Sequence, residues 1–378
     1  MTVTKSVSLE DQIKQLAKDE GAVLVGICSA DSINDKEFSD ASFLLPEAQS
    51  VISIALAYSD KAAKNHLAKI ETDTFNLEDG QMTIDLRRIG EKIKNFLEEK
   101  GYKAFNCEIN YDYRNNKVDQ AQYDLILALR ELEFKDKDKN YEMSRKEQKK
   151  LNMLRKMLDN PAQRRKMGEA FVPDFSHRCA AVASGLGRVG WSGNVVTEDY
   201  GARVLFNSII TDAKLIPDAP MEKNPCNNCK LCEKACQSGF FSRDEGEIIT
   251  IAGVEETIGK RKSIAYCCCI CGGMACQNRF PEFSTWSPYP PLSLPLDDTI
   301  DDFVFERQKE LLLSSDPEDA KYMLKFVRQI VNKLHNKPLD TYLLTCSQCQ
   351  LVCGPTMKDK KEAYKSIIDA GVIYKPKK

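Results

Sequence analysis

The chain has 378 residues, of which 42% are hydrophobic and 29% are charged, and its formal net charge is −2. This composition is typical of a globular protein with two or three domains, and the nearly balanced charge excludes a chain-wide field that would attract nucleic acid or an anionic membrane. Three histidines stand against fifteen cysteines, so a metal site is expected to be built from thiolates rather than from imidazoles.

Helices and strands are mixed in the first part of the chain. Leu9, Ile13 and Leu16 recur at helical spacing and Gly21 ends that pattern, whereas short apolar runs further on predict buried strands. The expected elements are a helix over 9–20, strands over 22–28 and 50–58, a helix over 82–100 and a strand over 102–109. We therefore interpret residues 1–113 as the first part of an α/β cofactor domain.

Charged residues dominate the next segment, 114–169, which we interpret as a helical insertion. Residues 131–169 contain 12 basic and 8 acidic side chains. Solvated helices with ion pairs four residues apart are the expected structure. The alternative is a docking arm for an acidic electron donor or for RNA.

Small residues and glycines return over 170–215, which we assign to the second part of the cofactor domain. Gly185, Gly187, Gly190 and Gly193 would let the backbone approach a flat or anionic group closely. Residues 202–211 then predict a clear strand. The glycine spacing matches neither the dinucleotide fingerprint nor the P-loop, so by itself it specifies no ligand.

Cysteine spacing carries the strongest chemical signal in the chain. The stretch Cys226–Cys236 reads C-x2-C-x2-C-x3-C, in which three thiolates surround one cubane iron–sulfur cluster and the fourth cysteine serves a second cluster. A later stretch, Cys346–Cys353, reads C-x2-C-x3-C, and a cysteine-rich patch at 267–271 lies between the two. Zinc sites and disulfides fit this doubled spacing less well.

The crossing pattern of two-cluster ferredoxins divides these cysteines into two ligand sets. One cluster would be held by Cys226, Cys229, Cys232 and Cys353. The other would be held by Cys346, Cys349, Cys236 and one cysteine of the 267–271 patch, with Cys267 favoured and Cys268 next.

The remaining boundaries follow from these motifs. Residues 216–357 are expected to form the two-[4Fe-4S] ferredoxin-like domain, with a helical insertion at 297–337, and 358–378 to form a C-terminal tail. We expect a cytoplasmic protein, because the first residues carry neither an apolar segment nor a twin arginine and no apolar run is long enough to cross a bilayer.

One ordered set of motifs resembles a known family. The stretch Ser176–Asn194 (SHRCAAVASGLGRVGWSGN) is followed by Tyr200-Gly201, by Ile210–Asp212 and then by the first cysteine motif. This order resembles the cobalamin-dependent epoxyqueuosine reductases and the reductive dehalogenases. The resemblance implies an α+β fold, in which a nitroreductase-like cobalamin domain is followed by a bacterial-ferredoxin-like module with two [4Fe-4S] clusters.

The resemblance also implies a function. Electrons from a low-potential ferredoxin or flavodoxin would pass through the two clusters to a corrinoid, which reduces a small halogenated or oxygenated substrate. The residues expected near the corrinoid are His177, Arg178, Gly185, Gly187, Ser192, Gly193 and Asn194. The candidate proton donors are Tyr111, Tyr113 and Asp174.

The chain departs from the family in places that leave alternatives open. In residues 171–174 (FVPD) the carboxylate is absent at the place where an epoxyqueuosine reductase carries its proton donor, so only Asp174 or Glu169 could stand in, and Gln237 stands where the family has proline. The main alternative is a two-cluster electron-transfer protein that serves a partner enzyme and holds no corrinoid of its own. A flavin in place of cobalamin and a tRNA substrate are less favoured.

Overall fold

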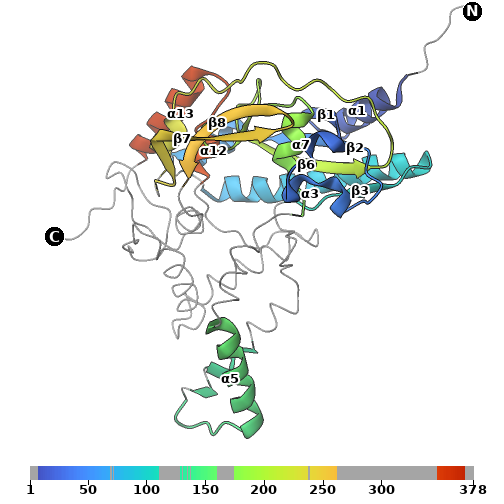
Figure 1. Ribbon diagram of the computed structural model, residues 1–378. Coiled ribbons are helices and arrows are strands. Elements are labelled where there is room, and N and C mark those ends of the chain that lie inside the picture. The colour runs from blue at the N-terminus through green and yellow to red at the C-terminus, as the bar shows by residue number, and fades with distance from the viewer. Residues whose placement is uncertain are drawn as a thin grey trace, which may run out of the picture. The chain divides into compact units, whose positions relative to one another are not determined.

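The structure is a computed structural model, and it describes residues 7–68, 70, 72–109, 128–129, 131–133, 135–136, 138–159, 174–236, 239–261 and 347–370. The chain divides into two compact units (Figure 1). The first comprises residues 1–109, 174–293 and 344–378, and the second comprises 110–173 and 294–343. The two parts predicted as cofactor domain and most of the cysteine-rich segment therefore share one unit.

A four-stranded antiparallel sheet forms the centre of the first unit. Its strand order is β1-β2-β6-β3, so the last strand in sequence lies between strands that precede it. The strands are β1 (Leu24–Ser29), β2 (Ser50–Ala57), β3 (Ala104–Asn106) and β6 (Val204–Thr211). β2 and β6 pair over their whole lengths, from Ser50 opposite Thr211 to Ala57 opposite Val204.

Both faces of this sheet are covered by helices, so its central strands β2 and β6 are buried along nearly their whole length (Figure 1). Ile52 and Ile54 of β2 pack in one core with α1 (Leu9–Asp19) and α3 (Thr72–Glu99). Val51 points to the other face, where it packs in a core with α7 (His177–Ala183). Alternate residues of a strand point to opposite faces, so one apolar strand serves two cores.

The sequence predicted the main elements of this unit but not all their bounds. The helix at 9–20 and the strands at 22–28, 50–58 and 202–211 are confirmed within a few residues. The prediction that the long helix begins at Met82 is wrong, because α3 begins at Thr72 and continues through Gly80. The strand predicted over 102–109 is much shorter than expected.

Each cysteine motif includes one very short helix, which carries Cys232 in the first motif and Cys349 in the last, and both helices pack against the same core. These are α8 (Leu231–Ala235) and α12 (Gln348–Leu351), which contact each other, and α13 (Met357–Asp369) packs beside them and against α2 (Asp60–Leu67). Between them in sequence stands a hairpin of β7 (Phe241–Ile251) and β8 (Val254–Arg261), which the sequence had not predicted. The remaining strands, β4 (Arg188–Val189) and β5 (Val195–Val196), form a small two-stranded ribbon.

The described part of the second unit centres on α5 (Arg145–Asp159). Its apolar contacts are four buried leucines, Leu129, Leu132, Leu151 and Leu154. Arg155 pairs with Glu133 at 2.6 Å and with Asp136 at 2.8 Å, so this charged segment carries ion pairs between its own side chains.

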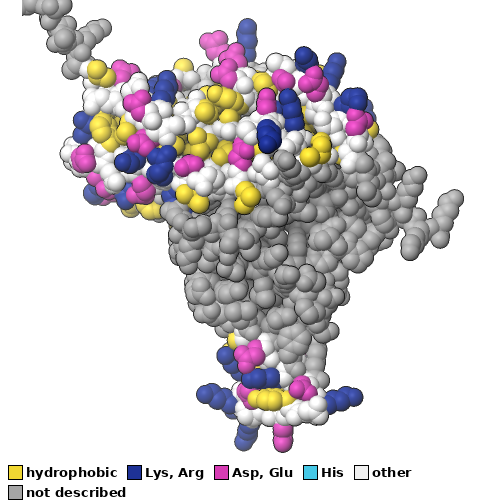
Figure 2. All heavy atoms as spheres, turned by 180° about the vertical axis from the view of Figure 1, so that it is seen from behind, with side chains coloured by type: hydrophobic (Ala, Val, Ile, Leu, Met, Phe, Trp, Pro, Cys, Tyr) yellow, Lys and Arg dark blue, Asp and Glu magenta, His cyan; other side chains and the backbone are white. Residues whose placement is uncertain are grey.

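Lysine and arginine side chains alternate with aspartate and glutamate over the described surface in Figure 2, as the balanced charge predicts. Among the described residues, no helix combines the length and the apolar character that crossing a membrane requires.

Candidate functional site

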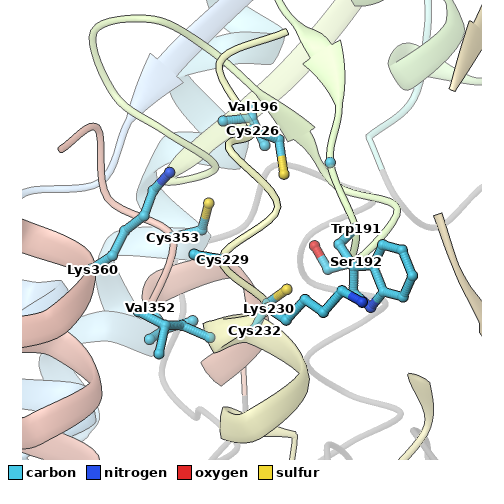
Figure 3. A pocket seen from close by; sticks show the side chains of 12 residues that line it. Trp191, Ser192, Val196, Cys226, Cys229, Lys230, Cys232, Val352, Cys353 and Lys360 are labelled. Carbon is cyan, nitrogen blue, oxygen red and sulfur yellow. The ribbon is translucent and has the colours of Figure 1, made fainter. Parts of the chain in front are cut away.

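Four cysteines from opposite ends of the cysteine-rich segment line a single pocket (Figure 3). Cys226, Cys229 and Cys232 come from the first motif, and Cys353 comes from the last, more than 100 residues later. Their companions in the pocket wall are Gly190, Trp191, Ser192, Val196, Lys230, Leu231, Val352 and Lys360. The structure thus brings together the four residues that the sequence assigned to one cluster.

A chain of polar contacts holds the first cysteine in place. The backbone N–H of Cys226 donates to Asn224 Oδ1 at 2.8 Å. Asn224 Nδ2 donates in turn to the carbonyl of Val189 and to Glu256 Oε2, both at 2.9 Å. Glu256 also forms an ion pair with the largely buried Arg188. The start of the cysteine loop is therefore fixed to β4 and to the β7–β8 hairpin.

The two motifs repeat one local backbone geometry. Lys230, directly after Cys229, has a left-handed φ of 55° and caps α8, which carries Cys232. Ser347, directly after Cys346, has a φ of 41° and caps α12, which carries Cys349. Left-handed backbone is uncommon outside glycine, so its recurrence at the same place in two C-x2-C-x3-C stretches indicates one structural unit used twice.

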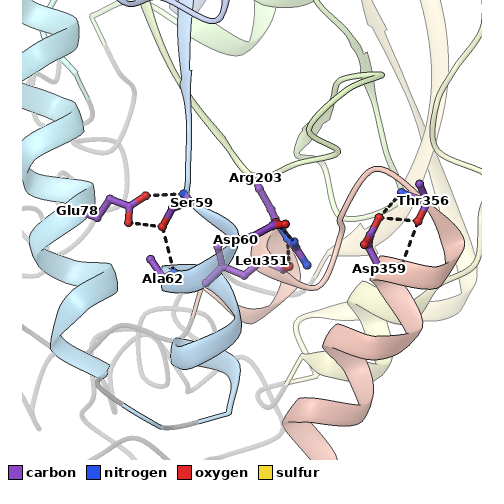
Figure 4. A network of polar contacts seen from close by, with 8 residues as sticks. All are labelled: Ser59, Asp60, Ala62, Glu78, Arg203, Leu351, Thr356 and Asp359. Carbon is purple, nitrogen blue, oxygen red and sulfur yellow. Dashed lines mark hydrogen bonds and ion pairs between the residues drawn. The ribbon is translucent and has the colours of Figure 1, made fainter.

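The residues that lead into β6 fix the position of the last cysteine. The N–H of Ala202 donates to the carbonyl of Cys353 at 2.8 Å, and Arg203 Nε donates to the carbonyl of Leu351 at 2.7 Å. Arg203 also pairs with Asp60 at 3.1 Å (Figure 4). Gly201, with a φ of 60°, lies so close to the backbone of Cys353 and Gly354 that a Cβ on it would stand 2.6 Å from the carbonyl carbon of Gly354.

The pKa values of the buried thiols reflect this crowding. Burial raises the pKa of Cys232 well above its usual value, and the neighbouring thiols Cys353, Cys349 and Cys226 raise it further. Burial likewise raises the pKa of Cys353 to about 11, although the charge of Lys360 opposes the shift. Without a cation to neutralise them, these sulfurs are expected to remain protonated.

The arrangement suits a cluster better than a single ion. Within the described residues, no group of three or more histidine, cysteine, aspartate or glutamate side chains is placed to hold one metal ion. In a four-iron cluster each thiolate binds a different iron, so the sulfurs stand around a volume instead of converging on a point. Four cysteines spaced around a pocket fit that requirement.

The ligands predicted for the second cluster are only partly described. Cys236 is buried, and its Sγ accepts a hydrogen bond from the N–H of Phe240 at 3.3 Å. Cys349 lies 3.8 Å from Asn194 Nδ2. Cys267, Cys268 and Cys346 lie outside the described residues, so this ligand set stays a prediction.

His177, predicted near the corrinoid, is bound on both sides by the protein itself. Its Nε2 lies 2.9 Å from the carbonyl of Glu108, and its Nδ1 lies 3.0 Å from Ser208 Oγ. Because a carbonyl only accepts, Nε2 carries the proton and Nδ1 accepts from the serine. Burial lowers the pKa of His177 to about 4, so the ring is neutral.

The other residues predicted near the corrinoid have three kinds of surroundings. A Cβ on Gly185 would meet the carbonyl oxygen of Ala219, and one on Gly187 would stand 2.6 Å from the carbonyl oxygen of Val196, so both glycines pack against protein backbone. Ser192 and Asn194 belong to the cysteine site, one in the pocket wall and the other beside Cys349. Arg178 donates to the carbonyl of Gly193 at 3.3 Å.

Of the three predicted proton donors, the structure describes Asp174 alone. Asp174 is buried, with an exposed fraction of 5%. Tyr111 and Tyr113 lie outside the described residues.

The pocket wall also contains residues that were not predicted as site residues from the sequence, among them Trp191, Lys230 and Lys360. Trp191 donates from Nε1 to the carbonyl of Ser242 at 3.2 Å, and the Lys230 ammonium lies 4.1 Å from the centre of its ring. Lys360 reaches the pocket from α13. The position of Lys230 inside the motif was a usable signal, whereas nothing in the sequence near Lys360 marks it as a site residue.

Comparison with known proteins places this site in a family context. No protein-family model matches the chain. Tetrachloroethene reductive dehalogenase of Desulfitobacterium hafniense is 34% identical over 68 residues, which are 17% of this chain and 12% of that protein. Epoxyqueuosine reductase of a Synechocystis species is 38% identical over 56 residues, which are 15% of this chain and 19% of that protein. The matched region thus spans less than a fifth of each curated relative.

Solved structures of the same two kinds resemble the chain over more of its length. The catabolic reductive dehalogenase NpRdhA, in complex with 3-bromo-4-hydroxybenzoic acid, has a TM-score of 0.44 at 14% identity, covering 90% of this chain and 40% of the other. An epoxyqueuosine reductase with a tRNA-Tyr stem loop has a TM-score of 0.37 at 12% identity, covering 96% and 99%. The resemblance to epoxyqueuosine reductases and reductive dehalogenases expected from the sequence is confirmed, as a distant and partial one.

Proposed function

We propose that the chain is an iron–sulfur reductase of the reductive dehalogenase or epoxyqueuosine reductase kind, with two [4Fe-4S] clusters and a corrinoid. The observation that supports it most is the pocket formed by Cys226, Cys229, Cys232 and Cys353. The curated relatives that match the chain are named as reductases, which supports an oxidoreductase activity. The specific fold assignment, a nitroreductase-like domain followed by a ferredoxin-like module, belongs to the same proposal.

The residues of the chain supply an enclosed and fixed ligand set for the first cluster. Cys353 is hydrogen-bonded through its carbonyl to Ala202, just before β6, and Cys226 is connected to β4 through Asn224, which supports a ligand set fixed by the protein. Fixed ligands and burial are the protein's means of setting the potential of a cluster. The second cluster would use Cys236, Cys346, Cys349 and Cys267 or Cys268.

The corrinoid in this proposal rests on the resemblance. When bound, it would supply the low-potential two-electron chemistry that reductive cleavage of a carbon–halogen or carbon–oxygen bond requires. Gly185, Gly187 and His177 have contacts within the protein, as described above, and we assign them no step. Asp174, Tyr111 and Tyr113 remain the proposed proton donors, and a ferredoxin or flavodoxin the proposed electron donor.

An electron-transfer protein without a corrinoid is the second candidate. It is favoured by Ser192 and Asn194, two residues expected around the corrinoid that instead lie with the cysteines. In that case the chain would pass electrons to a partner enzyme and would need no substrate site of its own.

Anaerobic reconstitution with iron, sulfide and hydroxocobalamin distinguishes the two functions. After desalting, retention of about one cobalt per chain beside the iron supports the reductase, and turnover would then be tested with haloaromatics and with epoxyqueuosine-containing RNA. Iron without cobalt would exclude the corrinoid and leave the electron carrier. A matched Cys353→Ala variant, which leaves the residues expected around the corrinoid unchanged, tests whether cobalt retention depends on the cluster.

A further inference from the structure

A buried lysine stands in the wall of the cysteine pocket. Lys360 is 3% exposed, although lysine is among the residues least often found fully buried. It belongs to the first turns of α13, whose start is fixed by a capping box between Thr356 and Asp359 (Figure 4). The helix therefore holds this side chain in a defined direction.

That direction is toward the thiols. Figure 3 shows the Lys360 side chain extending to the region of Cys353, and both residues line the same pocket. The backbone N–H of Lys360 donates to the carbonyl of Thr356 at 3.0 Å, whereas its ammonium makes no hydrogen bond or ion pair within the described residues.

A buried ammonium without a counter-charge is costly, because burial removes its hydration. The nearby buried cation, Arg203, has such a partner in Asp60, and its Nε also donates to the carbonyl of Leu351. Four thiolates around a cluster would give Lys360 the negative charge that it otherwise lacks. Lys360 is 3% exposed in a pocket whose described wall contains cysteines and no carboxylate, which points to a negatively charged occupant of the pocket.

We propose that Lys360 is the counter-charge of the cluster held by Cys226, Cys229, Cys232 and Cys353, and that it raises the reduction potential of that cluster. This inference rests on the proposed function. Reduction adds one negative charge to an already anionic cluster, so a fixed cation nearby stabilises the reduced state more than the oxidised state. Lys360 is a positioning residue for charge and takes no part in bond making.

The test compares two lysines on the same helix. Lys360→Gln removes the buried charge, whereas Lys358→Gln removes an equal charge from a side chain that is 83% exposed. Each reconstituted protein is titrated with dithionite and viologen mediators, and the cluster signals are followed by EPR. We expect Lys360→Gln to weaken reduction of one cluster at least tenfold, which is about 59 mV for a one-electron couple. We expect Lys358→Gln to leave it unchanged, because water and salt screen an exposed charge.

Each outcome decides a specific point. Equal potentials in Lys360→Gln and the parent, with equal iron content, would overturn the counter-charge role and leave the proposed function intact. A parent chain that takes up no iron would overturn both. If Lys360→Gln loses its cluster, the Lys360→Arg variant tests whether the positive charge is required. Retention of iron by the arginine variant supports that requirement, and loss of iron in both variants contradicts it.

Discussion

The close approach of Gly201 to the last cysteine gives the sharpest prediction on stability. Gly201 has a left-handed φ of 60°, and a Cβ there would overlap the carbonyl of Cys353 and stand 2.6 Å from the carbonyl carbon of Gly354. Gly253, in the β7–β8 turn, has a similar φ of 74°, but a Cβ there would meet no atom within 4 Å. Alanine at Gly253 therefore carries the backbone cost alone, while alanine at Gly201 adds a clash.

The two costs can be separated by magnitude. A left-handed backbone costs a non-glycine residue about 1–2 kcal/mol, and this applies to both sites. Overpacking adds about 1–3 kcal/mol, and only at Gly201. The smaller entropy of the unfolded alanine chain is common to both variants and cancels in the difference. Gly201→Ala should therefore lower the free energy of unfolding by about 1–3 kcal/mol more than Gly253→Ala does.

Urea unfolding followed by far-UV circular dichroism measures this difference, and iron content after reconstitution measures its effect on the site. We expect Gly253→Ala to bind as much iron as the parent and Gly201→Ala to bind less, because the clash displaces Cys353 from the pocket. Equal stability losses and equal iron contents in the two variants would refute the account of how the residues that lead into β6 position the last cysteine.

Three further predictions follow from hydrogen bonds and pKa values. Because burial holds the pKa of His177 at about 4, the contribution of the neutral ring to the free energy of unfolding should be fully present above pH 6.5 and fall by about 3 kcal/mol as the pH drops toward 4. His177→Gln should flatten this part of the profile of unfolding free energy against pH, and an unchanged slope would contradict the prediction. Asn224→Ala removes the acceptor of the Cys226 N–H and should cost about 1–3 kcal/mol and reduce iron uptake, whereas unchanged iron uptake would argue against its positioning role. Burial raises the pKa of Cys28 to about 12, so its reactive thiolate form is scarce at pH 8. In iron-free protein, iodoacetamide at pH 8 should therefore label the half-buried Cys229 before Cys28, and peptide mass spectrometry measures the order. The reverse order of labelling would be inconsistent with the burial of Cys28.

Elements with a strong apolar pattern could be predicted from the sequence, and elements stabilised by tertiary contacts could not. The run Ser50–Ala57 has no polar face, and it forms a strand buried on both sides. The first turns of α3 were missed because they are polar and include Gly80, which disfavours helix; Phe75, 2% exposed, is the apolar anchor there. The β7–β8 hairpin was missed because the charged run Arg243–Glu245 lies near the start of β7, and its packing depends on Trp191 fitting against Gly259.

In the cysteine site, too, the part set by local spacing could be predicted and the part set by tertiary contacts could not. The spacing of Cys226, Cys229 and Cys232 determines that one loop can surround a cluster, so that part could be predicted locally. The position of Cys353 in the same pocket was predicted by analogy with crossed ligand sets. The contribution of Lys360 could not be predicted, since its role depends on the direction in which α13 leaves the last cysteine loop, and adjacent lysines on that helix, such as Lys358, are exposed.

The proposed function requires that cysteines from both ends of the cysteine-rich segment share one cluster. Iron and acid-labile sulfide per chain, measured after anaerobic reconstitution of the parent, Cys353→Ala and Cys28→Ala, test it most directly. We expect about eight irons in the parent and in Cys28→Ala, and clearly fewer in Cys353→Ala together with a changed EPR signal. Equal iron content and identical spectra in all three proteins, or no iron in the parent, would contradict it.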